Sequence, residues 1–334
     1  MQDAKWHRLS WVVAVEVAFL AVAATFFLPG GDDLHRFYLP FSRGCLHCGF
    51  VPYFGQWVLW PLAFFPDAIA WPLWTAISLA GWLILSRYTG ANPAWVLLMF
   101  PTFGQVWLGQ IDILIAAGLA IAFFVDDPYV QGVGIALALI KPQITAIPLL
   151  YLLSCERDLR KVLAAPLLAL VMSVVVFGPG WPLDWLTNAT DHVPPHAWRL
   201  AAVDIWPWGL PLIAVPLFFP RRRVRFELAL LASALATPFM GIYSYMIFPL
   251  FIRRAWWIVP LSYIWVLAYP LYGNKAIRVL WVLPLALMAF IVYGEVRRKA
   301  AVNQDEPPCR ASRLLAALAE KARRADEWTR ASHE

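Results

Sequence analysis

The chain contains few charged residues. Only 14% of its 334 residues are Asp, Glu, Lys or Arg, whereas 61% are hydrophobic. An ordinary soluble domain carries about 25% charged residues, so this chain has too little polar surface to form a single water-soluble globule. Intrinsic disorder is excluded as well, because disorder requires low hydrophobicity and high charge. The scarcity of charge therefore predicts an integral membrane protein.

Other absences exclude several kinds of site. Four cysteines are too few for a disulfide scaffold, and the neighbours Cys45 and Cys48 are compatible with a local disulfide or with two free thiols. The sequence has no HExxH motif, no phosphate-cradling Gly-rich loop and no nucleotide fingerprint. We therefore expect no metal and no other cofactor, and we do not expect a soluble nucleotide donor. We also expect no nucleic-acid partner, because the net charge of +6 comes from basic residues in predicted loops.

The apolar segments predict an all-α polytopic membrane protein. A membrane helix needs about 20 mainly apolar residues, and the chain has room for about twelve such helices. The predicted segments are 9–28, 68–87, 92–108, 111–125, 130–153, 162–178, 205–220, 226–238, 243–252, 255–272 and 277–296. Lys141-Pro142 interrupts the segment 130–153, which we expect to form two half-helices meeting at that dipeptide. The apolar run 56–65 is too short to cross, so it predicts a juxtamembrane helix in the first outer loop.

The basic residues predict the orientation. Clusters occur at Lys5/Arg8, Arg87, Arg157/Arg160/Lys161, Arg221–Arg225, Arg253/Arg254 and Arg297–Lys299. Basic loops face the cytoplasm, so both termini should be cytoplasmic and loops 29–66 and 179–204 should be outside. Residues 1–299 then form the membrane domain. Residues 300–334 form a cytoplasmic linker and a basic amphipathic helix, which either lies on the inner leaflet or packs on the protein.

Two groups of charged residues are candidates for chemistry. Asp32 and Asp33 follow the first predicted span, where a carboxylate near a membrane face can act as a general base. A solvated turn with a helix cap is the commoner reason for such residues, since Asp is favoured in both. Lys141 lies between two apolar half-helices and can bind a phosphate, or else extend to the interface. Asp112 begins the fourth predicted span, where it can face the same cavity or cap the helix.

Four passages carry a family resemblance. They are residues 33–38, residues 59–74, the pair 109–114 and 134–142, and residues 236–245. In order and spacing they resemble the GT-C superfamily of polytopic lipid-phosphate-sugar glycosyltransferases, especially glycosyltransferase family 87. Members of that family are similar to polyprenyl-phosphate-mannose-dependent α-mannosyltransferases. Asp112 departs from the Asn usual in the family, which also often has a Ser and a His near the Thr237-Pro238 passage, a region that Tyr243 and Tyr245 occupy here.

The resemblance implies a GT-C-like fold and an inverting transfer of a sugar, mannose in particular, to an acceptor hydroxyl. Asp33 would be the base, and Lys141 would hold the donor phosphate with help from Arg36. The substrate cavity would be lined by Asp32, Gln110, Asp112, Tyr38, Tyr243 and Tyr245. The partners would be a polyprenyl-phosphate sugar, a lipid or glycan acceptor and membrane lipids. The implied location is a bacterial or archaeal plasma membrane, with the active site on the extracytoplasmic side.

A transporter or flippase for lipid-linked sugars is the alternative. Transporters of this size are often built from paired repeats with polar groups near the bilayer midplane. No internal repeat is visible in this chain, and its charged residues gather near the outer ends of the predicted spans. The pattern therefore favours the enzyme.

Overall fold

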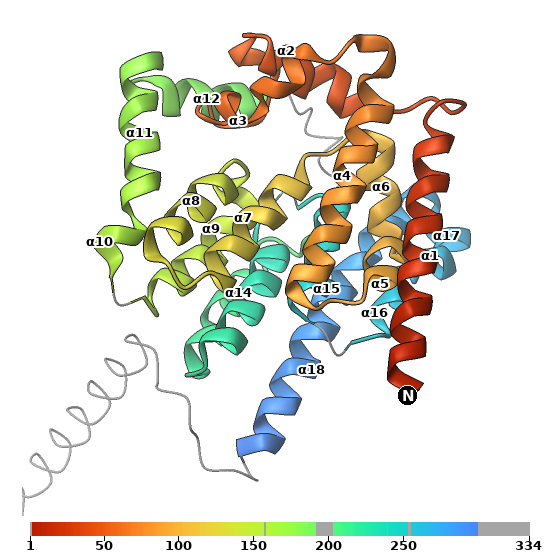
Figure 1. Ribbon diagram of the computed structural model, residues 1–334. Helices are drawn as coiled ribbons and strands as arrows, with labels where there is room; N and C mark the ends of the chain where they lie inside the picture. The colour runs from red at the N-terminus through yellow and green to blue at the C-terminus, as the bar shows by residue number, and fades with distance from the viewer. Residues whose placement is uncertain (1, 157, 192–202, 239, 253–254, 300–334) are drawn as a thin grey trace, which may run out of the picture.

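A computed structural model describes residues 2–156, 158–191, 203–238, 240–252 and 255–299 (Figure 1). The predicted tail at 300–334, together with Arg157, Arg253 and Arg254, lies outside the described residues. The regular elements of the described part are all helical, as predicted. They are α1 (Gln2–Ala24), η1 (Leu34–Tyr38), α2 (Leu39–Ser42), η2 (Leu46–Cys48), α3 (Gly55–Leu59), η3 (Trp60–Phe64), α4 (Asp67–Thr89), α5 (Pro93–Leu98), α6 (Phe100–Leu108), α7 (Asp112–Phe124), α8 (Pro128–Ala138), α9 (Pro142–Leu153), α10 (Leu159–Val162), α11 (Ala164–Phe177), α12 (Trp181–Asp191), η4 (Leu210–Phe218), α14 (Arg222–Ala236), η5 (Ile242–Ile247), α15 (Phe248–Phe251), α16 (Ile258–Leu261), α17 (Trp265–Tyr272), η6 (Gly273–Trp281) and α18 (Val282–Lys299).

Four helical segments of the described chain are long and apolar enough to cross a membrane. They are Trp6–Ala24, Asp67–Thr89, Leu159–Phe177 and Ile258–Arg298. On α1 the side chains of Phe19 and Leu20 are 72% and 65% exposed, which is favourable only against an apolar solvent. These segments support an integral membrane protein. Several other predicted spans are short or divided helices, such as α7, α9 and the α5–α6 pair, so the count of about twelve stays a prediction.

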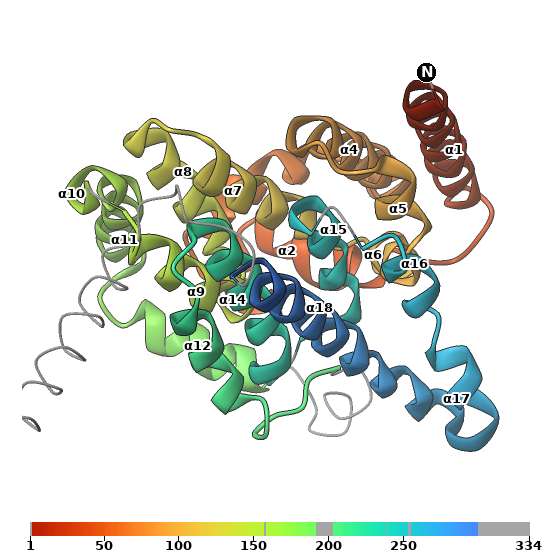
Figure 2. The same ribbon diagram turned by 90° about the horizontal axis from the view of Figure 1, so that it is seen from below.

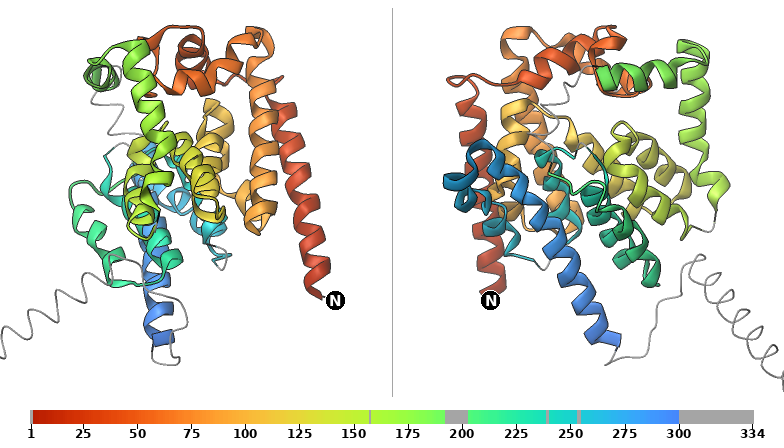
Figure 3. Two further views of the ribbon diagram at one scale, coloured as in Figure 1. Left: turned by 60° about the vertical axis from the view of Figure 1, so that its left-hand side comes forward. Right: turned by 180° about the vertical axis from the view of Figure 1, so that it is seen from behind.

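A layer of short helices lies across one end of the molecule. Figures 1 and 3 show α2, α3 and α12 across the upper ends of α4 and α11, with the start of α1 and the end of α18 on the opposite side. The indole N–H of Trp185 on α12 donates to the Phe50 carbonyl at 2.9 Å, which joins the two predicted outer loops. α3 and η3 form the helix predicted within 56–65. Cys45 and Cys48 form a disulfide in the same layer.

The centre of the molecule is built around α14. Every residue of α14 from Val224 to Ala236 is buried, and Figure 2 shows the helix between α9 and α18 while α1 lies at the periphery. The predicted interruption of 130–153 is confirmed, because α8 ends at Ala138 and α9 begins at Pro142. Pro142 fits the first turn because its missing N–H would have no helical partner there. The Thr145 hydroxyl donates to the Ala138 carbonyl at 2.9 Å, and the same carbonyl accepts from the Lys141 N–H at 3.3 Å, so the end of α8 is tied to the break.

Close packing of α7 against α8 places two charged side chains together. A Cβ on Gly118 would lie 2.5 Å from the backbone nitrogen of Ala138, and one on Gly134 would lie 2.6 Å from that of Ala122. Only glycine permits so close an approach of two helix backbones. α7 begins at Asp112 and α8 ends three residues before Lys141, so the packing brings the start of one helix to the end of the other.

Candidate active site

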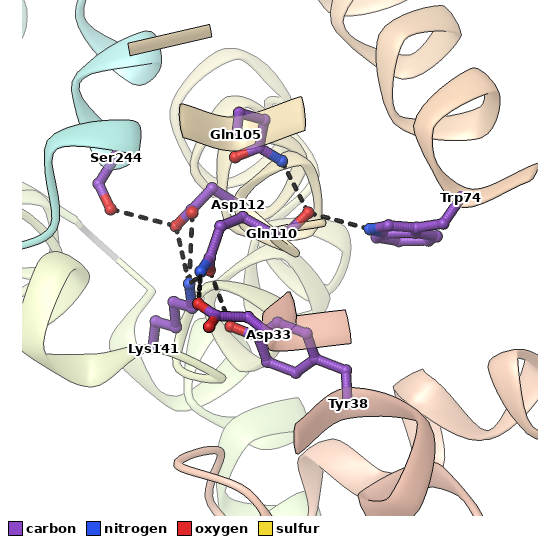
Figure 4. A network of polar contacts seen from close by, with 8 residues as sticks. All are labelled: Asp33, Tyr38, Trp74, Gln105, Gln110, Asp112, Lys141 and Ser244. Atoms are coloured by element: carbon purple, nitrogen blue, oxygen red, sulfur yellow. Dashed lines mark hydrogen bonds and ion pairs between the residues drawn. The ribbon is translucent and has the colours of Figure 1, made fainter. Parts of the chain in front are cut away.

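Eight side chains from distant parts of the sequence form one polar network (Figure 4). Gln110 lies at its centre. Its amide nitrogen donates to Oδ2 of Asp33, and its Oε1 accepts from the Tyr38 hydroxyl at 2.8 Å and from Lys141 Nζ at 2.8 Å. A single amide therefore connects the proposed base to the proposed phosphate-binding lysine. The structure brings Asp33, Tyr38, Gln110, Asp112 and Lys141 together, as the resemblance implied.

Two glycines in left-handed backbone conformation hold the loop of Asp33 against Gln110. Gly31 has φ +73° and Gly109 has φ +69°. The Gly31 N–H donates to the Trp107 carbonyl at 2.7 Å, and a Cβ on Gly109 would lie 2.7 Å from Cβ of Leu34. Residues with a Cβ avoid this conformation, so glycine is required at both turns. The two turns explain how Asp33 and Gln110, which are 77 positions apart in the sequence, form a hydrogen bond.

The backbone of Gln110 is fixed from the other side. Its carbonyl accepts from Nε2 of Gln105 at 2.7 Å and from the indole N–H of Trp74 at 3.0 Å. Trp71, three residues before Trp74 on α4, donates its indole N–H to the Val106 carbonyl at 2.8 Å. Both lone pairs of the Gln110 carbonyl are therefore used, and its side chain projects from a rigid turn.

Burial raises the pKa of Asp33 from its usual 3.8 to about 6. The charge of Lys141 opposes this rise, whereas the neighbouring carboxylates of Asp32 and Asp112 add to it. Burial also raises the pKa of Tyr38 well above its usual value, so its hydroxyl stays protonated and donates to Gln110. Asp33 is consequently a carboxylate with a proton affinity close to neutral pH, which is what a general base requires.

Lys141 and Asp112 form a buried ion pair. Nζ lies 3.3 Å from both carboxylate oxygens, and the two side chains are 8% and 0% exposed. The Ser244 hydroxyl donates to Oδ1 of Asp112 at 3.3 Å. The ammonium also lies over the rings of Tyr38 and Tyr243, at 5.8 and 5.0 Å from their centroids. Charge pairing and aromatic faces thus compensate a lysine that has lost its water.

Three predicted site residues lie apart from the network. The Arg36 guanidinium pairs with Asp32 at 2.9 Å, and the two side chains are 70% and 49% exposed. Tyr245 is fully buried, and its hydroxyl donates to the Val203 carbonyl at 3.1 Å. In the described structure Arg36 and Asp32 therefore form a surface pair beside the site, and Tyr245 bonds to the backbone elsewhere.

Sequence reasoning missed Ser244, Gln105 and Trp74. Ser244 lies between Tyr243 and Tyr245, and the resemblance assigns a place in the cavity to the two tyrosines alone. Trp71 and Trp74 are spaced for one helix face, which indicates packing but not the carbonyl they reach. Among the described residues, no group of three or more His, Cys, Asp or Glu side chains is arranged to hold a metal ion.

One family model matches part of the chain. Residues 52–200 match the model of glycosyltransferase family 87, which confirms the resemblance over the passages 59–74, 109–114 and 134–142; the passages 33–38 and 236–245 lie outside the matched range. Gln110, Asp112 and Lys141 lie within the matched range, and Asp33 and Tyr38 precede it. Neither a curated protein nor a solved structure matches the chain. Over this range the chain is therefore similar to a family of glycosyltransferases.

Proposed function

Proceeding from the match to glycosyltransferase family 87, we propose that this chain transfers a sugar, mannose in particular, from a polyprenyl-phosphate donor to an acceptor hydroxyl. The acceptor is a lipid or a glycan. One observation carries the proposal: Gln110 bonds both to Asp33 and to Lys141, so a basic carboxylate and a cation lie in one network. Such a transfer needs both groups, because a hydroxyl loses a proton while a phosphate leaves with negative charge.

Asp33 is the base in this proposal. The acceptor oxygen attacks the anomeric carbon, the bond from that carbon to the phosphate oxygen breaks, and the leaving phosphate takes the electron pair. Asp33 accepts the hydroxyl proton. Gln110 occupies Oδ2, which leaves Oδ1 as the oxygen to face the acceptor. A single displacement of this kind inverts the configuration at the anomeric carbon.

Lys141 stabilises the departing phosphate in this proposal. An ammonium has three N–H donors, and those of Lys141 point to Gln110 and Asp112. A phosphate oxygen of the donor would replace the Gln110 contact, while Asp112 and Ser244 hold the ammonium in place. Arg36 lies three residues after Asp33 in η1, with an exposed guanidinium that can bind a second phosphate oxygen. Asp32, Tyr38 and Tyr243 complete the surroundings of the site, whereas the Tyr245 hydroxyl is bonded to the Val203 carbonyl.

We further propose a GT-C-like fold of about twelve spans, oriented with the α2–α3–α12 layer outside and both termini cytoplasmic. Basic clusters occur near the start of α1 and at the end of α18, and both of these helix ends lie on the side of the molecule opposite the layer. Because basic segments face the cytoplasm, this arrangement supports the proposed orientation. The site would then open to the extracytoplasmic side of a bacterial or archaeal plasma membrane. The donor lipid would reach it laterally from the bilayer.

The test is a transfer assay in proteoliposomes. Purified protein receives either labelled polyprenyl-phosphate sugars, including mannose, or labelled nucleotide sugars, together with a membrane extract as acceptor source. We expect label in a new glycoside only from the lipid-phosphate donor, with the anomeric configuration inverted. Label transferred from the nucleotide sugar would contradict the donor assignment. Movement of the lipid-linked sugar across the bilayer without any new glycoside would instead identify a flippase.

A further inference from the structure

A pocket of about 470 Å³ lies in the layer formed by α2, α3 and η3. Its lining includes Ser42 and Arg43 from the end of α2, and Gln56, Trp57 and Trp60 from α3 and η3. The volume falls within the range of small-molecule sites, which is about 300–1,000 Å³. None of these residues belongs to the network around Gln110, so the pocket is distinct from the candidate active site.

The polar groups of the pocket are held in place. The Arg43 guanidinium donates to the Phe65 carbonyl at 2.8 Å and pairs with Asp67 at 2.7 Å. These contacts involve Nη2, so the guanidinium keeps further N–H donors for a ligand. The Gln56 amide nitrogen donates to the Phe41 carbonyl at 3.1 Å, which orients the amide and leaves its oxygen as an acceptor. The pocket thus offers fixed donors and a fixed acceptor side by side.

Two tryptophans provide the apolar surface. Trp57 and Trp60 are 40% and 59% exposed. The Trp57 ring stacks on that of Phe177, with 5.8 Å between the ring centroids and 23° between the planes. The Trp60 ring meets that of Phe64 edge to face, with 5.0 Å between the centroids. These contacts cover part of each indole, and the exposed remainder can pack against a ligand.

The charge of the pocket selects between two kinds of ligand. Asp67 lies 2.7 Å from Arg43 and is 71% exposed, so the pair presents almost no net charge. A phosphate would be repelled by Asp67 while it competes for Arg43. A hydroxyl-rich neutral molecule instead fits paired donors and acceptors flanked by indole rings, because a sugar has polar edges and apolar C–H faces.

We propose that this pocket binds a neutral sugar unit, and that the unit is part of the acceptor. The binding site stands on the pocket alone, whereas the acceptor role rests on the proposed function. η1 runs directly into α2, so Ser42 follows Tyr38 by four residues, a rise of about 6 Å along a helix. A glycan seated on Trp57 and Trp60 would therefore lie within a few sugar units of Asp33.

The experiment measures sugar binding to the full chain in detergent micelles. Saturation-transfer NMR titrations use the methyl glycosides of glucose, galactose and mannose, with dihexanoyl phosphatidylglycerol as the anionic lipid probe. Trp60→Ala removes an indole that is 59% exposed, so the fold should persist. Trp60→Phe keeps an aromatic face, Gln56→Leu removes the amide, and Trp6→Ala at the start of α1 is the matched control, since Trp6 is 67% exposed.

We expect at least one glycoside to bind the unmodified chain, with affinity reduced about fivefold or more by Trp60→Ala. Gln56→Leu should also weaken binding, whereas Trp60→Phe and Trp6→Ala should bind as the unmodified chain does. The proposal is overturned if no glycoside binds, if Trp60→Ala has no effect, or if the anionic lipid is the probe whose binding depends on Trp60. Asp33→Asn should retain glycoside binding. Transfer activity persisting in that variant would refute the catalytic role of Asp33 and leave the sugar pocket intact.

Discussion

Asp33→Asn should stabilise the protein while it abolishes sugar transfer. Burial raises the pKa of Asp33 from 3.8 to about 6, so the folded state binds its proton more tightly than the unfolded chain does. The stabilisation that follows is present below pH 3.8 and is lost as the pH rises through 6. At neutral pH the ionised carboxylate therefore lowers the stability of the fold. Asparagine carries no charge there, and its side-chain oxygen can still accept from Gln110.

The size of the effect follows from the same pKa. One pKa unit corresponds to about 1.36 kcal/mol, so the rise from 3.8 to about 6 corresponds to at most about 3 kcal/mol. The free energy of unfolding of Asp33→Asn, relative to the unmodified protein, should increase by most of that amount between pH 4 and pH 7.5. For a chain of this size we expect the apparent Tm at pH 7.5 to be higher by roughly 5 °C.

Thermal unfolding in detergent, followed by tryptophan fluorescence at both pH values, measures this difference. Asp32→Asn is the matched control, because the neighbouring side chain is 49% exposed and forms a surface pair with Arg36. Surface pairs contribute about 0–1 kcal/mol, so this variant should show little dependence on pH. The reasoning is refuted if Asp33→Asn is destabilised at pH 7.5, or if its stability relative to the unmodified protein is the same at both pH values.

Three further predictions concern the same network. The kcat/KM of sugar transfer should rise with pH with a midpoint near 6, because Asp33 must be ionised to accept a proton; a flat profile from pH 5 to 7.5 would exclude it as the base. Lys141→Ala leaves the buried carboxylate of Asp112 without its ion-pair partner, so the stability measured by thermal unfolding should fall by about 3–5 kcal/mol. Adding Asp112→Asn should restore part of that stability, while donor binding stays weak in the double variant. Donor binding at the unmodified level in that double variant would remove Lys141 from phosphate recognition. Gly109→Ala places a Cβ 2.7 Å from Cβ of Leu34, so it should lower the free energy of unfolding by about 1–3 kcal/mol and reduce transfer. Gly178 also has a positive φ, but a Cβ there meets nothing within 4 Å, so Gly178→Ala should have the smaller effect. Equal effects of the two substitutions would show that the contact with Leu34 is unimportant.

The break at Lys141-Pro142 could be predicted from the sequence because its cause is local. A proline lacks the N–H that a helix interior uses, and a lysine in an apolar run needs a polar partner. The partner itself could not be predicted in this way. Asp112 meets Lys141 only because Gly118 and Gly134 let α7 and α8 approach closely, which is a tertiary contact.

Family resemblance, and not local physics, predicts a place for Asp33 beside Lys141. The sequence Gly30-Gly31 is compatible with a turn, but only the contact between Gly31 and the backbone at 107–109 shows where that turn leads. For Tyr243 and Tyr245 it is local geometry, and not family resemblance, that distinguishes the two residues. They are two residues apart in η5, a tight helix with about three residues per turn, so their side chains point in different directions. Of these two tyrosines, Tyr243 is the one whose ring lies under the Lys141 ammonium.

The span count is the least predictable part of the fold. Segments that appear as continuous apolar runs in the sequence are divided in the structure, as at Met99 between α5 and α6. Hydropathy measures composition and does not show whether a helix continues. Short helices at membrane depth require surrounding protein to satisfy their ends, and that protein is visible only in the folded chain.

The most direct test of the central claim compares initial rates of sugar transfer from the polyprenyl-phosphate donor at pH 7.5. The unmodified protein, Asp33→Asn and Asp32→Asn are assayed side by side at equal amounts of folded protein. If Asp33 is the base, Asp33→Asn should lose at least about 10²-fold in rate while Asp32→Asn stays within severalfold of the unmodified protein. Equal rates for Asp33→Asn and the unmodified protein would show that the carboxylate held by Gln110 takes no part in the reaction.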